Sequence, residues 1–267
     1  MEETLSRIYK SLPDSKRLTN KGTFLIMQPE VSTMKTVLFD LDGTLLPMEQ
    51  DAFIKAYFGG LVTKLLPYGY DPNLLIKAIW TGTGAMVAND GSRSNEDAFW
   101  AAAATVLGAD CRKDEPIFAD FYKKEFQFVS TSCGYTPEAG KLIAWLKAKG
   151  CRLVLATNPI FPAIATQRRM SWAGLEETAF ELVTTYENSR HCKPNLDYYR
   201  DILQTIGQRA ENCIMVGNDV TEDMVAKELG LEVFLLTDHM INKQQVDISQ
   251  YDHGSFAELK EFLLRRI

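Results

Sequence analysis

The sequence lacks the features that mark membrane, secreted and nucleic-acid-binding proteins. Its uninterrupted apolar runs, such as Thr36–Phe39, are far too short to cross a bilayer, and no apolar signal region stands at the N-terminus. The net charge is -6 and the pI is near 5.3, so the chain has no basic character with which to hold a nucleic-acid backbone. We therefore expect the protein to act on a small molecule and to bind neither nucleic acid nor a membrane. No protein partner is evident from the sequence.

Cysteine is also scarce. The five cysteines are an odd number, lie far apart and form no Cys-x-x-Cys pair, which argues against both a disulfide framework and a zinc site. A reducing compartment, the cytoplasm, is the natural expectation.

The sequence does contain a regular alternation of strand and helix patterns. Short apolar runs rich in β-branched residues predict five buried strands at Thr36–Phe39, Arg152–Ala156, Glu181–Thr184, Cys213–Val216 and Glu232–Leu236. Helical patterns follow at Pro137–Lys149, Pro162–Trp172, Leu196–Ile206, Glu222–Leu229 and Ser255–Leu264. This alternation predicts an α/β fold with a doubly wound parallel sheet, covered by helices on both faces.

Residues 48–134 interrupt the alternation with helical patterns alone. The expected helices are Gln50–Leu66, Pro72–Trp80, Asn95–Leu107 and Asp114–Phe128. We expect an inserted all-helical module, called the insert below. Its aromatic side chains are more typical of a bundle core than of a ligand cage: Phe53, Tyr57, Phe58, Trp80, Phe99, Trp100, Phe118, Phe121 and Tyr122.

The predicted domain organisation therefore has three parts. Residues 34–47 and 135–267 form the α/β core, and residues 48–134 form the helical insert. Residues 1–33 show no strong periodicity and are expected to be an N-terminal extension, the alternative being a helix over Glu2–Leu12 that packs on the core.

Polar residues follow the predicted strands, at the edge where a doubly wound sheet binds its ligands. The first run leads into Asp40–Thr44, the second into Thr157 and Asn158, and the fourth into Gly217–Asp223. Lys193 stands at the head of the helix after the third run. Four separate segments thus bring carboxylates, a hydroxyl, an amide and an ammonium group to one edge.

Asp40 and Asp42 are two residues apart, and this spacing directs both carboxylates to one side of an extended chain. Adjacent carboxylates repel unless a cation lies between them or one is protonated. A hard Mg²⁺ ion resolves the conflict and takes oxygen ligands. Asp219 and Asp223, four apart at the beginning of a helix, can complete the site, although Asp223 can also simply favour the helix N-terminus.

These segments resemble the four motifs of the haloacid dehalogenase (HAD) superfamily, in order and spacing, from Lys35 nearly to the C-terminus. The matching segments are Val-Leu-Phe-Asp40-Leu-Asp42-Gly-Thr-Leu, Val-Leu-Ala-Thr157-Asn158, Lys193-Pro194, and Val-Gly217-Asn218-Asp219 through Asp223. The resemblance is to the phosphatase branch with a helical C1-type cap and a Rossmann-like core. It implies an Mg²⁺-dependent phosphoric monoester hydrolase that acts on a small phosphorylated metabolite.

The resemblance also implies a role for each residue. Asp40 attacks phosphorus and forms an aspartyl-phosphate, while Asp42 protonates the leaving oxygen and then activates water. Thr157 and Lys193 hold the phosphoryl oxygens, with Asn158 beside them in the substrate site. Asp40 and Asp42, together with the acids of the fourth motif, hold the metal.

The fourth motif departs from the family pattern. The family usually has an acid directly after the glycine, whereas here Asn218 takes that position and Asp219 follows. Asp is the better Mg²⁺ ligand, and the interval from Asp219 to Asp223 matches one common family spacing. We therefore expect Asp219 to face the metal, with Asn218 binding through its carbonyl or orienting a neighbour.

By the same resemblance, the insert is a lid over Asp40. Its loop at residues 89–95 is the best candidate for substrate contacts, because Arg93 could pair with an anionic leaving group. The alternative is a solvated connection in which Ser94 or Asn95 caps the next helix.

Two other functions remain open. A phosphomutase similar to β-phosphoglucomutase would share the whole set of residues. A catalytically idle binding module would keep the fold, but the intact acids and Lys193 disfavour it. Asp42 argues against a dehalogenase, because dehalogenases of the superfamily lack this second acid.

Overall fold

The computed structural model describes residues 35–267, which belong to one compact unit beginning at Met34. The predicted extension over residues 1–33, and the alternative helix within it, lie outside the described residues. Within residues 35–267, no helix combines the length and apolar character needed to cross a membrane.

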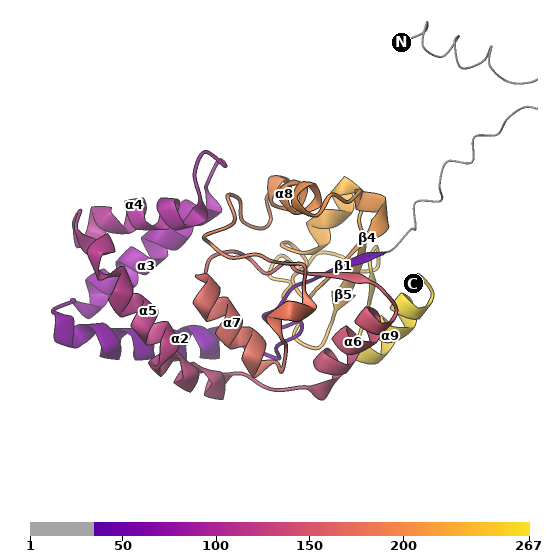
Figure 1. The fold of residues 1–267 in the computed structure, drawn as a ribbon, viewed down its shortest axis with the longest axis horizontal. Helices are drawn as coiled ribbons and strands as arrows, with labels where there is room; N and C mark the ends of the chain where they lie inside the picture. Colours follow the sequence, from indigo (N-terminus) through magenta and orange to yellow (C-terminus); the bar gives the residue numbers. More distant parts are fainter. Residues whose placement is uncertain (1–34) are drawn as a thin grey trace, which may run out of the picture. The chain divides into compact units, whose positions relative to one another are not determined.

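A single six-stranded sheet forms the centre of the fold (Figure 1). Its strands are β1 (Thr36–Phe39), β2 (Arg152–Leu155), β3 (Leu182–Val183), β4 (Cys213–Gly217), β5 (Glu232–Leu236) and β6 (Asp252–Gly254). The order is β3-β2-β1-β4-β5-β6, and every neighbouring pair is parallel. The predicted α/β class with a parallel sheet is confirmed, and β6 is an additional strand at one edge.

Alternate side chains of the strands face opposite sides of the sheet, as the period of two requires. Val37 and Phe39 of β1 belong to one buried cluster, with residues of α6 (Pro137–Ala148), α7 (Ala163–Trp172) and α9 (Phe256–Leu264). Leu38 belongs to a second cluster, with α8 (Leu196–Ile206) and the 3₁₀ helix η7 (Met224–Leu229). In Figure 1, α8 lies on one side of the sheet and α6 and α9 on the other, so both faces are covered.

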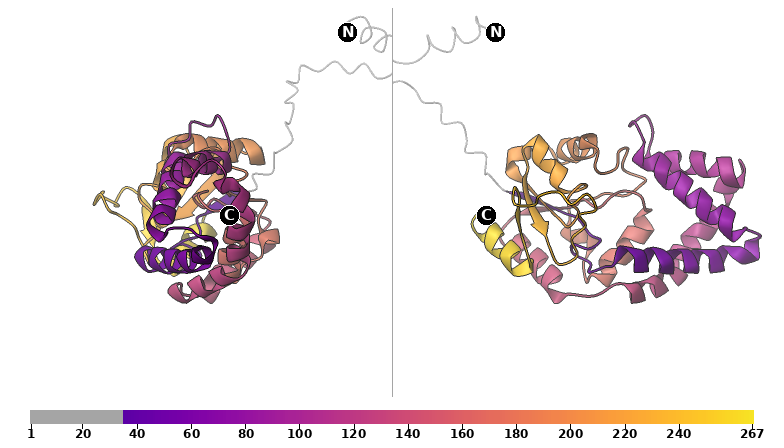
Figure 2. Two further views of the ribbon diagram at one scale, coloured as in Figure 1. Left: turned by 90° about the vertical axis from the view of Figure 1, so that its left-hand side faces the viewer. Right: turned by 180° about the vertical axis from the view of Figure 1, so that it is seen from behind.

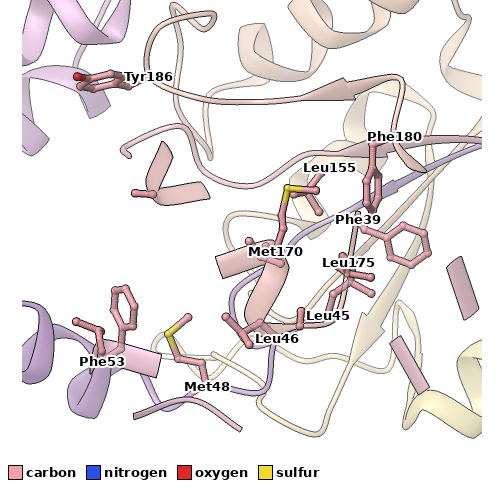
Figure 3. Close-up of a cluster of buried hydrophobic side chains, with 14 of the residues drawn as sticks. Phe39, Leu45, Leu46, Met48, Phe53, Leu155, Met170, Leu175, Phe180 and Tyr186 are labelled. Atoms are coloured by element: carbon pink, nitrogen blue, oxygen red, sulfur yellow. The ribbon is translucent and has the colours of Figure 1, made fainter. Parts of the chain in front are cut away.

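The first cluster fixes the position of the loop after β1. Phe39 lies close to Leu155 of β2 and to Phe180, while Leu45 and Leu46 from the loop are fully buried near Met170 of α7 (Figure 3). Burying a leucine side chain contributes about 1.5–3 kcal/mol, so these two leucines anchor the loop against the core.

Between β1 and α6 the described chain forms helices and no named strand. The helices are α2 (Gln50–Leu65), α3 (Pro72–Val87), α4 (Asn95–Leu107) and α5 (Glu115–Lys123), with 3₁₀ segments η2 (Leu66–Tyr68), η3 (Cys111–Asp114) and η4 (Glu125–Ser132). Helices α2 to α5 gather on the side away from α9 (Figure 2). The expected helix Asp114–Phe128 divides at Lys124, and α3 continues to Val87 instead of ending at Trp80. The exact domain division stays a prediction.

The two ends of the insert meet where they join the core. Met48 forms an antiparallel bridge with Cys133, and the backbone N–H of Gly134 donates to the carbonyl of Pro47 at 2.7 Å. The chain therefore leaves and re-enters the core through paired segments.

Candidate active site

A buried lysine links two carboxylates beyond the carboxyl ends of β1 and β4. Lys193 Nζ lies 2.9 Å from Asp40 Oδ1 and 2.6 Å from Asp223 Oδ1, and Lys193 is only 1% exposed. Burial alone would lower the pKa of Lys193, but the carboxylates of Asp223 and Asp40 raise it well above its ordinary value. Lys193 is therefore a fixed cation beside Asp40.

The second oxygen of Asp40 faces Asn218 across a shared hydroxyl. Thr44 Oγ1 lies 3.3 Å from Asp40 Oδ2 and 3.1 Å from Asn218 Oδ1. The amide of Asn218 donates from Nδ2 to the carbonyl of His239, which orients its oxygen toward Thr44. This close approach needs a glycine at position 43, because Gly43 has φ +84° and a Cβ there would lie 2.2 Å from Asn218 Nδ2.

These oxygens fit the expected Mg²⁺. One hydroxyl hydrogen cannot bind Asp40 Oδ2 and Asn218 Oδ1 at the same time, so the pair has room for another electropositive partner. Carboxylate and amide oxygens are among the ligands that Mg²⁺ and similar hard cations take in proteins. Across residues 35–267, no group of three or more His, Cys, Asp and Glu side chains is spaced to hold a metal ion, so any such site here includes the amide oxygen or other groups.

Asp42 pairs with Arg169, a residue that the sequence analysis did not single out. Arg169 of α7 is 1% exposed; its Nη1 contacts Asp42 Oδ2, its Nη2 donates to Thr166 Oγ1, and its guanidinium lies 4.5 Å from the ring centre of Phe161. Burial raises the pKa of Asp42 to about 6, opposed by Arg169 and supported by Asp40. The remaining oxygen, Asp42 Oδ1, is buried and has no hydrogen-bond partner among residues 35–267. A carboxyl group with this pKa can give and take a proton near neutral pH.

A signal for Arg169 was present in the helix pattern. Arg169 follows Ala165 by four residues and Thr166 by three, so all three share the buried face of α7. A cation on such a face requires a buried partner, because an unpaired buried charge is costly.

Thr157 and Asn158 connect the second and fourth segments. The carbonyl of Thr157 accepts hydrogen bonds from the hydroxyls of Thr184 (2.7 Å) and Tyr198 (2.9 Å), which fix the end of β2. Asn158 Nδ2 donates to Glu222 Oε2 at 3.0 Å. Burial raises the pKa of Glu222 to about 7, although Lys193 opposes the shift.

The chain is similar to a known protein family over most of its length. A model of the haloacid dehalogenase-like hydrolases matches residues 34–230. The chain belongs to this family. The predicted family and fold class are confirmed.

Two curated relatives are phosphatases. The chain is 28% identical over 211 residues to phosphoglycolate phosphatase of Rhodospirillum rubrum, an alignment that covers 76% of this chain and 79% of that protein. It is 27% identical over 135 residues to glyceraldehyde 3-phosphate phosphatase of Methanothermobacter thermautotrophicus, which covers 48% of this chain and 58% of that protein. The predicted enzyme class, a phosphoric monoester hydrolase, is confirmed at this level.

Solved structures share the fold. A predicted phosphatase from Clostridium acetobutylicum aligns with a TM-score of 0.52 and 20% identity, covering 87% of this chain and 99% of its own. A predicted phosphoglycolate phosphatase from Haemophilus somnus aligns with a TM-score of 0.50 and 19% identity over the same shares of the two chains. At this identity the likeness concerns the fold alone.

Within the fourth motif of this HAD-family chain, Asp219 makes local contacts. Its Oδ1 accepts hydrogen bonds from the backbone N–H groups of Thr221 (2.7 Å) and Glu222 (2.9 Å), and its own N–H donates to Asp223 Oδ2 at 2.9 Å. Asn218 instead lies within reach of Thr44, next to Asp40. Which of the two residues faces a metal ion stays a prediction.

The loop at residues 89–95 does not bring Arg93 to the cluster around Asp40 and Lys193. Arg93 is exposed, and the loop contacts the core through Asn95, whose Nδ2 lies 3.3 Å from Cys192 Sγ. Ser94 Oγ accepts from the backbone N–H of Asp97 and so caps α4, as in the alternative that the sequence left open.

A cavity of about 750 Å³ lies between the helical insert and the core of this HAD-family chain. Asp42 and Asn218 stand in its wall, and Arg93 does not. Eight of the nine aromatic residues expected to form the insert's core also line the cavity, and Phe121 is the exception. The aromatic side chains therefore pack against one another and also form the wall of a binding site.

Proposed function

We propose that this enzyme is a cytoplasmic, Mg²⁺-dependent phosphatase that hydrolyses a small phosphorylated metabolite through an aspartyl-phosphate on Asp40. The observation that carries the proposal is the contact between Asp40 and the buried Lys193, with Asp42 two residues away at a pKa of about 6. A nucleophilic carboxylate, a fixed cation and a proton donor are the groups that a two-step displacement at phosphorus needs.

In the first step, an oxygen of Asp40 attacks phosphorus, and the bond from phosphorus to the leaving oxygen breaks. Protonated Asp42 gives its proton to that oxygen, which leaves as an alcohol. Lys193 and Thr157 bind the non-bridging phosphoryl oxygens, with Asn158 beside them. Since charge develops on these oxygens, a preorganised cation stabilises the transition state more than the ground state.

In the second step, Asp42 is a carboxylate and takes a proton from water. The water oxygen forms a bond to phosphorus, the acyl phosphate bond breaks, and Asp40 and inorganic phosphate are released. Arg169 is a positioning residue in this scheme. Its contact with Asp42 Oδ2 holds the carboxyl group in one orientation.

Asp40 and Asn218 are the proposed side-chain ligands of Mg²⁺, with Asp42 next to them in the first motif. Asp223, bound by Lys193, and Asp219, which caps the following turn, support the site from behind. When bound, the ion would neutralise charge on the phosphoryl oxygens.

The test is to trap the covalent intermediate. Asp42→Asn should form a phosphorylated Asp40 from 2,4-dinitrophenyl phosphate, because this leaving group needs no proton and only the second step lacks its base. Mass spectrometry of the acid-quenched peptide detects it. Asp40→Asn should carry no phosphate and no activity, and Asp197→Asn, an exposed acid paired with Arg200, is the matched control. Full turnover by Asp40→Asn would refute the proposal.

A further inference from the structure

The position of Asp42 fixes where the leaving group lies. Asp42, two residues from Asp40, and Asn218, which shares the Thr44 hydroxyl with Asp40, both stand in the wall of the 750 Å³ cavity. The alcohol part of the substrate must therefore extend into this cavity. A volume of this size is typical of sites that enclose a drug-sized ligand and is far more than a two-carbon alcohol fills.

The cavity wall is aromatic. Ten of its residues are Phe, Tyr or Trp, and they come from both sides of the cavity, for example Phe58, Trp100 and Tyr122 from the insert and Phe161 from the core. Ring edges and faces both occur, since Phe58 and Trp80 are tilted at 47° and Trp100 and Phe118 meet edge to face at 89°. Such walls favour a flat aromatic ligand over a polyol, because offset and edge-to-face contacts stabilise ring pairs beyond their buried area.

The charges in the wall exclude a second anion. Besides Asp42, five acidic residues line the cavity, and the wall contains no arginine; its only lysine is Lys243 and its only histidine is His239. Lys243 Nζ lies 3.3 Å from Gln50 Oε1, and His239 Nδ1 lies 3.1 Å from Glu49 Oε1, so both already have partners at the start of α2. A carboxylate or second phosphate on the alcohol would meet a wall in which five acids outnumber the single lysine, and burying it there would be costly.

The wall nevertheless provides a few hydrogen-bond donors. Trp100 is 4% exposed, and its Nε1 meets no acceptor in hydrogen-bond geometry within residues 35–267. Tyr57 and Tyr122 share one hydrogen bond between their hydroxyls at 2.9 Å, which leaves one hydroxyl hydrogen to donate. Buried donors without partners are uncommon in proteins, and these can bind a neutral oxygen or nitrogen acceptor of a ligand.

We propose that the substrate is the phosphate monoester of an aromatic alcohol that carries no second negative charge, an inference that rests on the phosphatase function proposed above. The ring fills the cavity between the insert and the core, and the phosphate lies against Asp40. This substrate class differs from phosphoglycolate, whose leaving alcohol is glycolate, a small molecule that carries a carboxylate.

The test is a panel of primary-alcohol phosphates, which keeps the leaving-group chemistry similar. Ethyl, benzyl and naphthylmethyl phosphate vary the ring, and 4-carboxybenzyl and 4-(aminomethyl)benzyl phosphate vary the charge. With Mg²⁺ and the full chain, kcat/KM should rise at least about tenfold from ethyl to benzyl and rise again to naphthylmethyl. The value of kcat/KM for the carboxybenzyl ester should be at least about tenfold lower than that for the benzyl ester. The aminomethyl ester, which carries a positive charge, should show no such loss. Equal values for ethyl and naphthylmethyl, or a preference for phosphoglycolate or carboxybenzyl phosphate, would overturn the inference.

Variants of the wall connect the preference to the cavity. Phe58→Leu should lower the ratio of naphthylmethyl to ethyl kcat/KM about fivefold or more. Phe128→Leu is the matched control, because Phe128 lies in the insert, is 75% exposed and is not part of the wall. Asp51, an exposed wall residue at the start of α2, tests the effect of charge. Asp51→Lys should raise kcat/KM for 4-carboxybenzyl phosphate relative to kcat/KM for benzyl phosphate. Unchanged ratios in both wall variants would contradict the inference even if Phe58→Leu were poorly folded.

The two proposals fail in different ways. If the wild type hydrolyses neither this panel nor an aryl phosphate, the phosphatase proposal fails and the substrate class fails with it. If it hydrolyses ethyl phosphate or phosphoglycolate through Asp40 but gains nothing from a ring, the phosphatase proposal stands and only the substrate class is wrong.

Discussion

Replacing Lys193 by Met should strongly destabilise the protein as well as inactivate it. Lys193 is 1% exposed and contacts Asp40 and Asp223, which are 7% and 1% exposed. Met keeps most of the volume but leaves two buried carboxylates without their cation. Removing one partner of a buried ion pair costs about 3–5 kcal/mol. For a chain of this size that corresponds to a fall in Tm of about 6–20 °C, at about 2–4 °C per kcal/mol.

The assay is equilibrium urea unfolding with a chelator present, because a bound cation would partly replace the ammonium group. Lys141→Met is the matched control, since Lys141 pairs with Glu138 on the surface at 2.7 Å and surface pairs contribute about 0–1 kcal/mol.

The pH dependence of this deficit has a definite sign. Burial raises the pKa of Asp223, and the loss of Lys193, which opposes this shift, raises it further. The folded variant therefore binds a proton at Asp223 more tightly than the unfolded chain does, and its deficit in stability shrinks as the pH falls. In the wild type the pKa of Lys193 is raised. The stability that its charge contributes is therefore complete below the ordinary lysine pKa and is lost only at higher pH. A deficit below about 1 kcal/mol at pH 7, or one that stays constant between pH 5 and pH 8, would refute this account of the buried cluster.

Three further predictions concern Arg169, Asp42 and the pair Asn218 and Asp219. Arg169→Lys keeps the charge but loses the planar guanidinium group that orients Asp42. In steady-state kinetics, kcat for an alkyl phosphate should fall about tenfold with little change in KM, whereas kcat for dinitrophenyl phosphate should fall far less. Because burial raises the pKa of Asp42 to about 6, its proton is lost as the pH rises, so kcat/KM for an alkyl phosphate should decline above pH 6 in a pH–rate profile. The residual activity of Asp42→Asn should lack this decline. Asn218→Asp should lower the Mg²⁺ concentration for half-maximal activity about tenfold, whereas Asp219→Asn should leave it nearly unchanged; the opposite pattern in a Mg²⁺ titration would restore Asp219 as the ligand.

The four inner strands, β2, β1, β4 and β5, were predictable because strands buried on both faces are short, continuous apolar runs. The edge strand β6 has no such pattern, since Asp252 and His253 are exposed; besides its backbone pairing with β5, Arg266 contacts Glu232 of β5 and Asp252 of β6. The end of α3 was missed for a different reason. Gly82 and Gly84 lower helix propensity, but a Cβ at Gly82 would lie 2.4 Å from the ring of Phe99, so this glycine permits close packing of α3 against α4.

The gathering of polar residues after the strands was also predictable, because parallel strands end at one edge and the loops there carry the polar groups. The structure brings Asp40, Lys193 and Asp223 into direct contact. The partner of Asp42 was not predictable in the same way. Arg169 is 127 residues away in the sequence, and only the packing of α7 against the loop after β1 brings the two together.

The paired junction at the base of the insert has a consequence for how such a chain can diverge. Met48 and Cys133 lie side by side, and Gly134 is bound to Pro47, so the insert begins and ends at one point of the core. Substitutions, insertions or even exchange of the helices between these points need not move Asp40, Lys193 or any strand. The wall that selects the alcohol can therefore change while the groups that act on phosphorus stay fixed, and new substrates become accessible to an unchanged reaction.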